Sequence, residues 1–443
     1  MGPSASSRRV AWELLRAVWQ DGAYANIAWP TILGSSQLTG ADRGFATELA
    51  YGSLRHYGQW SQILERAGNR SQDRVDDEVW WVLVLGTHQL LSLQTPAHAA
   101  VNESVELCRE VGKKSATGLV NAVLRKVASH DLDQWRELLA AGVADPVAKE
   151  AVRGAHPEWI ASLLHEALER EGCGGELPQL LSAHNSPARV TLAVINGEPG
   201  PTRTPFSPLG EYVDGAPGDD QRVRDGSARV QDEGSQLAAL VASGLGLPAD
   251  ALVVDACAGP GGKTAVLSRH FSRVIALEQH EHRSELVRQA TASAAHPVAV
   301  HTVDAREYFR AHPAQADLVV LDAPCLGLGA LRRRPEARWI KTPGDLEDLV
   351  EAQRELLRAA VSGLRPGGFC LYITCSPVVA ETTEQVAWIC REVPQLRRLD
   401  TGPIVNQVAR ETVSDSALGS AVQLWPHRHG TDAMFIQVLQ LDA

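Results

Sequence analysis

The sequence predicts two architectures in one chain: an all-α helical bundle, followed by an α/β domain with a doubly wound, mostly parallel sheet. Over residues 8–140, apolar residues recur at three- and four-residue spacing between short polar breaks, which indicates amphipathic helices. From about residue 230, short apolar runs alternate with helix-like stretches, as buried parallel strands and their connecting helices do. A glycine-rich turn follows the first of these runs.

The composition is that of folded domains. Of 443 residues, 44% are hydrophobic and 21% are charged, and the length exceeds that of one ordinary core. We expect a helical domain over 1–145, a linker with a small α+β subdomain over 146–228, and the α/β domain over 229–443. The net charge of −11 argues against a simple nucleic-acid coat protein, although it permits a local basic groove.

Cysteine usage and hydropathy indicate the compartment. The seven cysteines form no CxxC pair and no paired spacing, which argues against a disulfide framework and against a structural zinc site. No uninterrupted apolar run reaches the length of a membrane span. We therefore expect a cytoplasmic monomer without metal or membrane attachment.

The expected elements follow in chain order. Helices are predicted in RRVAWELLRAVW, RGFATELAYGSLRHYGQWSQILE and DEVWWVLVLGTHQLLSL, and a strand in ARVTLAVIN. Residues 200–227 are rich in Gly, Pro and Asp and predict turns or a loop. Five buried strands are then predicted in ALVVDAC, RVIALEQ, PVAVHTV, DLVVLDAP and GGFCLYITC, with helices such as HRSELVRQATASAA between them.

The glycine-rich stretch ACAGPGGKT, residues 256–264, resembles two nucleotide-binding patterns and completes neither. A P-loop needs glycine where Cys257 stands, and a dinucleotide fingerprint needs it where Thr264 stands. Its strand–turn–helix context is that of a ligand site, although such a turn can also be an ordinary tight connection. Glu278 ends the next strand, where an acid can bind ribose hydroxyls, and Asp304 ends the third. A nucleoside without a triphosphate, such as S-adenosylmethionine, fits these features, and Cys257 argues against a P-loop ATPase.

Two cysteines end neighbouring strands over the same edge of the predicted sheet. Cys325 lies in LDAPCLGLG and Cys375 in YITCSP. A thiolate can add to an electron-poor ring. Addition at C6 of cytosine would let C5 take a methyl group, and Asp322 is placed for a hydrogen bond at N3. The other cysteines are interpreted as packing residues: Cys108, Cys173, Cys257, Cys370 and Cys390.

These motifs resemble the Nop/Sun family of RNA cytosine-5 methyltransferases, as do RVQDEGSQ at 229–236 and PHRHGTDAMF at 426–435. The resemblance runs from about residue 230 to the C-terminus and implies a Rossmann-like, S-adenosylmethionine-dependent enzyme. It implies that Cys375 is the nucleophile and that Cys325 helps to release the product, whereas the DNA enzymes use the Pro-Cys cysteine as nucleophile. The implied cofactor contacts are Ala258, Gly259, Pro260, Gly261, Gly262, Lys263, Glu278, Asp304 and Asp322, with Lys263 contacting either the cofactor or the target base.

The sequence departs from the family pattern at four places, one of which is the middle region, where the expected Arg-Val-Asn strand is blurred in ARVTLAVIN. Leu326 replaces the usual Ser after Pro-Cys, Glu381-Thr382-Thr383 replaces Glu-Asn-Glu, and Glu278 stands where Asp is common. The catalytic residue types are retained, so these departures bear on the RNA contacts more than on the reaction.

The N-terminal helices resemble the NusB-like domain of antitermination factors, in DRGFATELAYGSLR, PAHAAVNESVELCREVG and TGLVNAVLRKV. Fusion of such a bundle to this methyltransferase resembles the bacterial enzymes of small-subunit ribosomal RNA. The resemblance implies RNA binding by 1–145 and by the 146–228 subdomain.

A basic run after the fourth predicted strand supports an RNA partner. Arginines can grip phosphates and a tryptophan can stack on a base, although a basic run is also typical of a solvated turn. The residues concerned are Arg332, Arg333, Arg334, Arg338 and Trp339. We expect methylation of cytosine C5 in 16S ribosomal RNA. The alternatives are another RNA such as transfer RNA, or a NusB-like RNA-binding factor without catalysis.

Overall fold

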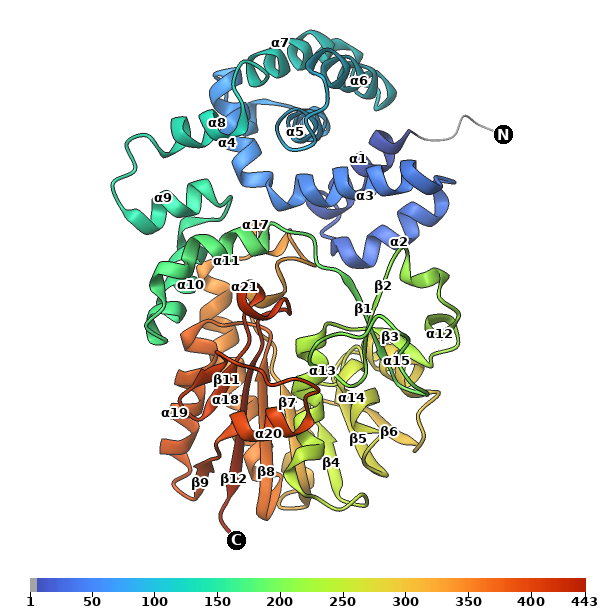
Figure 1. Cartoon of the computed structure of the whole chain (residues 1–443), viewed down its shortest axis with the longest axis vertical. Coiled ribbons are helices and arrows are strands. Elements are labelled where there is room, and N and C mark those ends of the chain that lie inside the picture. The colour runs from blue at the N-terminus through green and yellow to red at the C-terminus, as the bar shows by residue number, and fades with distance from the viewer. Residues whose placement is uncertain (1–5) are drawn as a thin grey trace. The chain divides into compact units, whose positions relative to one another are not determined.

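The computed structural model describes residues 6–443, which form two compact units (Figure 1). The helical unit comprises the residues up to His165, together with Gly175–Ser186 and Leu331–Lys341. The α/β unit comprises Glu166–Gly174, Pro187–Ala330 and Thr342–Ala443. This confirms the predicted fold class, a helical bundle followed by a mostly parallel α/β domain. No helix in the described part of the chain is both long and apolar enough to span a membrane.

The helical unit contains the helices that the periodicity predicts over residues 8–140, and further helices after them that were not predicted. In chain order they are α1 (Ser7–Trp19), α2 (Ala25–Ser35), α3 (Gly40–Arg55), α4 (Tyr57–Gly68), α5 (Asp77–Leu91), α6 (Ala97–Glu110), α7 (Thr117–Val127), α8 (Leu132–Ala140), α9 (Pro146–Arg153), the first part of α10 (Glu158–Arg170), α11 (Leu177–His184) and α17 (Ala337–Ile340).

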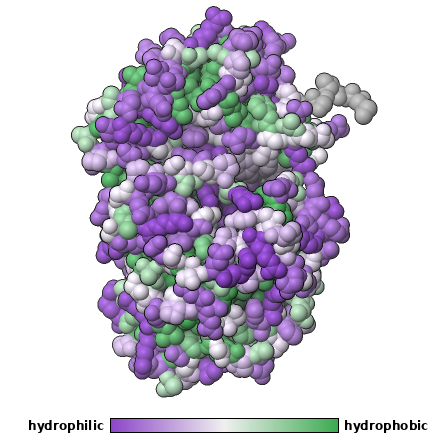
Figure 2. Space-filling model, in the orientation of Figure 1, coloured by the Kyte–Doolittle hydropathy of each residue, from purple (hydrophilic) through white to green (hydrophobic). Residues whose placement is uncertain are grey.

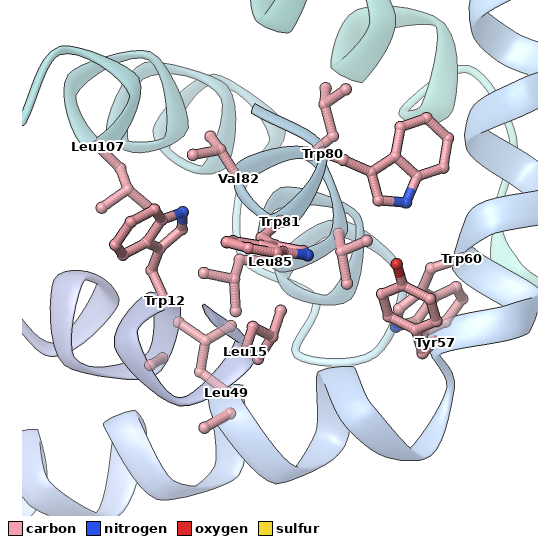
Figure 3. Close-up of a cluster of buried hydrophobic side chains, with 14 of the residues drawn as sticks. Trp12, Leu15, Leu49, Tyr57, Trp60, Trp80, Trp81, Val82, Leu85 and Leu107 are labelled. Atoms are coloured by element: carbon pink, nitrogen blue, oxygen red, sulfur yellow. The ribbon is translucent and has the colours of Figure 1, made fainter. Parts of the chain in front are cut away.

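Helix α5 forms the centre of this bundle. Its sequence is apolar on nearly every face, and 12 of its residues are buried, which is the pattern of a helix surrounded by others. Figure 3 shows tryptophans from α1 and α5 in the same apolar cluster, where Trp12 meets Trp81 edge to face at 5.9 Å between ring centroids. Outside the core, hydrophilic residues dominate the face of the molecule shown in Figure 2.

The helical unit extends beyond the boundary predicted at residue 145. Helix α9 begins at that boundary and packs against α8. The buried Gln59 donates from Nε2 to the carbonyl of Val152 at 2.7 Å, and Arg153 forms an ion pair with Glu137 at 2.8 Å. The sequence Asp145-Pro146 thus marks a helix start, with Pro in the first turn, and not an interdomain linker.

The main sheet of the α/β unit has the order β10-β11-β12-β8-β7-β4-β5-β6, and β9 pairs with β12. The five predicted strands are its parallel half: β4 (Leu252–Asp255), β5 (Arg273–Glu278), β6 (Val298–Thr302), β7 (Ala316–Asp322) and β8 (Leu364–Thr374). The antiparallel half was not predicted and consists of β9 (Leu396–Arg398), β10 (Ala417–Leu418), β11 (Ala421–Gln423) and β12 (Phe435–Leu441).

Both faces of this sheet are covered by helices. Along β7, Val319 and Leu321 enter one apolar cluster, while Leu318 and Val320 enter the other, as the two-residue period of a strand requires. The first face is covered by α16 (Ala305–Ala311), α18 (Pro343–Ser362) and α19 (Thr383–Glu392); the second is covered by α13 (Glu233–Leu240), α14 (Gly262–Leu267) and α20 (Thr401–Val408). The remaining helices of the unit are α12 (Gln221–Arg224), α15 (Glu281–Thr291) and α21 (Pro426–His429).

A second, three-stranded antiparallel sheet lies in the predicted subdomain. Strand β1 (Val190–Val194) confirms the strand expected in ARVTLAVIN and pairs with both β2 (Gly210–Val213) and β3 (Ala228–Val230). The stretch 200–227, predicted as turns alone, therefore contains β2 and α12. Glu211 of β2 and Arg222 of α12 form an ion pair at 2.7 Å, which joins these two short elements.

The segment Leu331–Lys341 belongs to the helical unit, and the burial of Arg338 there corrects its RNA-binding prediction, whereas the prediction for the partly exposed Trp339 stays a prediction. Arg338 is fully buried and donates to Asn185 Oδ1 at 2.7 Å and to the carbonyls of Ala155 and His184, both at 3.2 Å. A guanidinium enclosed in this way is not available to a phosphate.

Trp339 is also held within the helical unit. Its indole N–H donates to the carbonyl of Leu54 at 2.8 Å, and its ring lies so close to Gly58 that a Cβ there would collide with it. Arg332, Arg333 and Arg334 remain partly exposed, and the guanidinium of Arg334 lies 4.8 Å from the centroid of the Tyr24 ring.

Arg338→Ala is expected to destabilise the helical unit by about 2–4 kcal/mol, because it removes the donor to two buried carbonyls and to the partly buried Asn185 Oδ1 and opens a cavity. Urea denaturation measures this change. Arg125→Ala, at an exposed position of α7, is the control and should change the stability by less than about 0.5 kcal/mol. Loss of RNA affinity by Arg338→Ala at unchanged stability would contradict the packing role.

Candidate active site

The glycine-rich turn joins β4 to α14 and lies against the neighbouring elements of the sheet. Gly261 has a φ of 97°, and a Cβ there would also collide with Ala290 of α15. A Cβ at Gly259 would collide with the carboxylate of Glu278. Both positions therefore require glycine, one for backbone conformation and one for the approach of an acidic side chain to the turn.

Glu278 ends β5 and is almost fully buried, with its carboxylate facing this turn. Its Oε1 accepts the backbone N–H of His280 at 3.0 Å, and its Oε2 lies 3.4 Å from Nε of Arg283. Arg283 also donates to the carbonyl of Gly259 at 2.7 Å, so it joins Glu278 to the turn. A buried carboxylate beside exposed glycine backbone is suited to binding hydroxyl groups.

Asp304 caps α16 at the end of β6. Its Oδ1 accepts the N–H of Arg306 at 2.8 Å, and its carboxylate also bonds the Arg306 guanidinium. The hydrogen bonds from Arg306 hold the pKa of Asp304 below its ordinary value. Asp304 therefore remains a carboxylate at this edge of the sheet.

Lys263 and Asp322 form an ion pair in the same region. The distance between Nζ and Oδ2 is 2.7 Å, and Lys263 is only 9% exposed although it follows a glycine turn. Burial alone lowers the pKa of Lys263, but the adjacent Asp322 carboxylate outweighs this effect and the pKa lies above its ordinary value. The lysine is therefore a fixed cation within the site.

The two predicted cysteines are in contact. Cys325 Sγ and Cys375 Sγ lie 3.4 Å apart, and both residues are partly exposed. The hydrogen bond with Cys375, together with burial, raises the pKa of the Cys325 thiol well above its ordinary value. Cys375 also interacts electrostatically with Lys263. The structure therefore brings Cys325, Cys375, Asp322 and Lys263 together.

Backbone contacts fix the two cysteine loops relative to each other. The N–H of Gly329 donates to the carbonyl of Cys375 at 2.9 Å, and the N–H of Ala433 donates to the carbonyl of Gly329 at 3.0 Å. A Cβ at Gly329 would collide with the carbonyl of Ala433. Glycine is thus required where the chain of the Cys325 loop passes against that of Cys375.

Asp255, at the end of β4, is an acidic residue that the sequence reasoning missed. It is completely buried, and its Oδ2 accepts the hydroxyl of Thr264 at 2.7 Å. Burial raises its pKa to about 7. The signal in the sequence was a carboxylate ending the otherwise apolar run LVVD, directly before the glycine turn.

The predicted site residues divide between the two units. The cysteines, Asp322, Glu278, Asp304 and the glycine turn all lie in the α/β unit, at the carboxyl ends of parallel strands, where ligands of such sheets bind. Arg332, Arg333 and Arg334 lie in the helical unit. Cys370 is buried in the core of the sheet, as its packing interpretation expects.

Comparison with known families matches each unit separately. Residues 243–440 match the family model of the 16S rRNA methyltransferase RsmB/F, and residues 5–129 match that of the NusB family. A Mycobacterium tuberculosis protein that carries a provisional methyltransferase name is 42% identical over 461 residues, covering 99% of this chain and 97% of that protein. The ribosomal RNA small subunit methyltransferase B of Vibrio cholerae is 30% identical over 393 residues, covering 83% and 85%.

A solved structure shares the fold over nearly the whole chain. The crystal structure of PH0851 covers 98% of this chain and 99% of its own, with a TM-score of 0.78 at 19% sequence identity.

The buried carboxyl of Asp255 should make stability depend on pH. Its pKa in the folded protein, about 7, exceeds its ordinary value of 3.8. Its contribution to the free energy of unfolding is therefore complete below pH 3.8 and is lost as the pH rises through 7. Asp255→Asn removes this dependence. Urea denaturation should therefore show the variant gaining stability relative to wild type between pH 5 and pH 8. Asp250→Asn, at an exposed position, should show no such change, and an equal difference at both pH values would contradict the assignment.

Proposed function

The chain belongs to the RsmB/F family of 16S rRNA methyltransferases, and we propose that it methylates C5 of a cytosine in 16S ribosomal RNA, with S-adenosylmethionine as the methyl donor. One observation carries the proposal: two thiols lie 3.4 Å apart beside a Lys263–Asp322 ion pair, at the carboxyl ends of adjacent parallel strands. This arrangement suits addition to and elimination from a pyrimidine ring.

Cys375 is the nucleophile in this proposal. A thiol reacts as its thiolate, which a nearby cation favours, and the Lys263 ammonium interacts electrostatically with Cys375. Cys325 has a raised pKa and is held mainly as a thiol. The Cys375 thiolate adds to C6 of cytosine, a C6–S bond forms, and the electron pair of the C5=C6 bond becomes available at C5.

Asp322 and Lys263 stabilise the ring while it gains electrons. Oxygen Oδ2 of Asp322 is held by the Lys263 ammonium, which leaves its other oxygen for a polar group of the base. Bound S-adenosylmethionine supplies an electrophilic methyl group on a sulfonium sulfur. This methyl group would pass to C5, and the sulfur would keep the electron pair of the broken S–C bond.

Cys325 assists the elimination that follows. The proton on C5 must leave, its electron pair re-forms the C5=C6 bond, and the C6–S bond breaks to return the Cys375 thiolate. The contact with Cys375 is the main cause of the raised pKa of Cys325. Once Cys375 is bonded to carbon, that cause is removed, so the partly exposed Cys325 can pass its own proton to solvent water, and its thiolate can then accept the proton from C5.

The residues of the glycine turn fit an S-adenosylmethionine molecule. Glycine at 259 leaves the buried Glu278 carboxylate next to the turn backbone, where it can accept from ribose hydroxyls. The predicted contacts of Ala258–Lys263, Glu278 and Asp304 are part of this proposal.

Two features support RNA as the substrate. The NusB match covers most of the helical unit, and Arg332, Arg333 and Arg334 are partly exposed there. Relatives that carry the ribosomal RNA small subunit methyltransferase name support 16S ribosomal RNA over transfer RNA. The target base must leave its stack to reach the cysteines.

Tritiated methyl transfer to unmodified 16S RNA, with transfer RNA and assembled small subunits in parallel reactions, tests this proposal. Wild type should methylate 16S RNA, and Cys375→Ala should lose at least ~1,000-fold in rate because no C6–S bond forms. Cys325→Ala should accumulate a covalent protein–RNA adduct on a denaturing gel, because elimination is blocked.

Cys390→Ala is the matched control, because Cys390 lies on α19 outside the site, and it should behave as wild type. Methylation by Cys375→Ala would contradict the choice of nucleophile. RNA binding without any methyl transfer by wild type would favour the non-catalytic RNA-binding alternative.

A further inference from the structure

The loop that carries Cys325 is held by a buried carboxylate. Glu381, in the 3₁₀ turn Val379–Glu381 that precedes α19, is fully buried, and its Oε1 accepts the backbone N–H of Leu326 at 2.7 Å. This bond fixes the peptide that directly follows Cys325. The same oxygen accepts from Nε2 of Gln353 at 3.2 Å.

Gln353 holds the other side of Cys325. It lies on α18, is fully buried, and donates from Nε2 to the carbonyl of Pro324 at 2.8 Å. Glu381 and Gln353 are therefore bonded to each other and to the two residues that flank Cys325. These contacts leave the cysteine little freedom to move along the loop.

Tyr372 of β8 also belongs to this hydrogen-bond network. Its hydroxyl donates to the carbonyl of Glu381 at 2.8 Å and lies 3.4 Å from Oε1 of Gln353. Tyr372 is itself fully buried and packs edge to face on Phe435, with 6.2 Å between ring centroids. Three elements of the α/β unit thus converge on one loop.

A charged group in this place is costly for stability. Removing a carboxylate from water costs several kcal/mol before its partners compensate, and apolar residues of similar size often stabilise a core as well or better. Glu381 also interacts electrostatically with Cys325. The hydrogen bond with Cys375 and burial are the larger causes of the raised pKa of Cys325, and Glu381 adds to them. A stability role alone does not account for a carboxylate bonded to the loop of a reactive thiol.

We propose that Glu381 and Gln353 are a pair of positioning residues that hold Cys325 for release of the methylated base. The inference rests on the proposed function, and it concerns only the elimination step: loss of the C5 proton, re-formation of the C5=C6 bond and cleavage of the C6–S bond to Cys375. Addition and methyl transfer are assigned to Cys375, Asp322 and Lys263, whereas the bonds of the pair described above go to the residues that flank Cys325.

Glu381→Leu removes the acceptor oxygen while retaining much of the side-chain volume. Single-turnover methylation should stay within about threefold of wild type, multiple-turnover methylation should fall at least ~10-fold, and the covalent adduct should accumulate as in Cys325→Ala. Glu381→Gln keeps an acceptor oxygen and should resolve the adduct faster than Glu381→Leu. A merely structural role would lower both rates together.

Two further variants keep the test decisive. Tyr372→Phe removes one hydroxyl and retains the ring packing, so it serves as the test if Glu381→Leu does not fold. It should slow elimination by a smaller factor than Glu381→Leu. Gln437→Leu, on β12, removes a buried amide that bonds Leu399 and Ser420 and not the Cys325 loop, and it should not accumulate adduct. Thermal unfolding of each variant reports folding.

The outcomes separate this inference from the proposed function. If Cys325→Ala traps an adduct while folded Glu381→Leu and Tyr372→Phe turn over normally, the positioning role is overturned and the reaction stands. If neither Cys325→Ala nor Glu381→Leu traps an adduct while wild type methylates, the roles proposed for the two cysteines are overturned, and the positioning role that rests on them is overturned with them.

Discussion

The contact between the sulfurs of Cys325 and Cys375 is the interaction on which the rest of the site depends. The two residues are 50 positions apart, and they meet because β7 and β8 are adjacent parallel strands whose last paired residues are Asp322 and Ile373. The bond from Gly329 to the carbonyl of Cys375 then brings the two loops together beyond the strands. A shift in the register of β7 against β8 would separate the sulfurs, and a shift of β7 against β4 would move Asp322 away from Lys263.

The surroundings give two identical side chains different chemical character. Cys375 interacts electrostatically with the Lys263 ammonium. Cys325 is affected instead by the carboxylates of Glu381 and Asp322, which raise the pKa of Cys325 further, beyond the larger effects of Cys375 and burial. The ion pair of Lys263 with Asp322 extends this arrangement to the glycine turn, so the expected methyl donor and the expected nucleophile share one cation.

The sequence predicted the parts of the fold that follow simple periodicity, and it missed the parts that depend on long-range pairing. Strands β4–β8 and helices α1, α3 and α5 have apolar patterns, whereas β9–β11 have two or three residues each and form by pairing, β9 and β11 with β12 and β10 with β11. Arg338 was assigned to RNA because its basic run follows closely after Asp322 and Cys325, yet the segment Leu331–Lys341 packs into the helical unit and buries it. Motif spacing identified the cysteines and Asp322. Asp255 and the bonds of Glu381 were missed because burial of a carboxylate is visible only in three dimensions.

The central claim is that Cys375 bonds to the target cytosine, and 5-fluorocytosine in the RNA tests it most directly. Fluorine at C5 cannot leave as the proton does, so elimination stops after methyl transfer and the adduct persists in wild type. Digestion and mass spectrometry of this adduct should find the methylated fluoropyrimidine on the peptide that contains Cys375. Attachment to Cys325, or methylation of normal RNA without any adduct on the fluorinated RNA, would contradict the account.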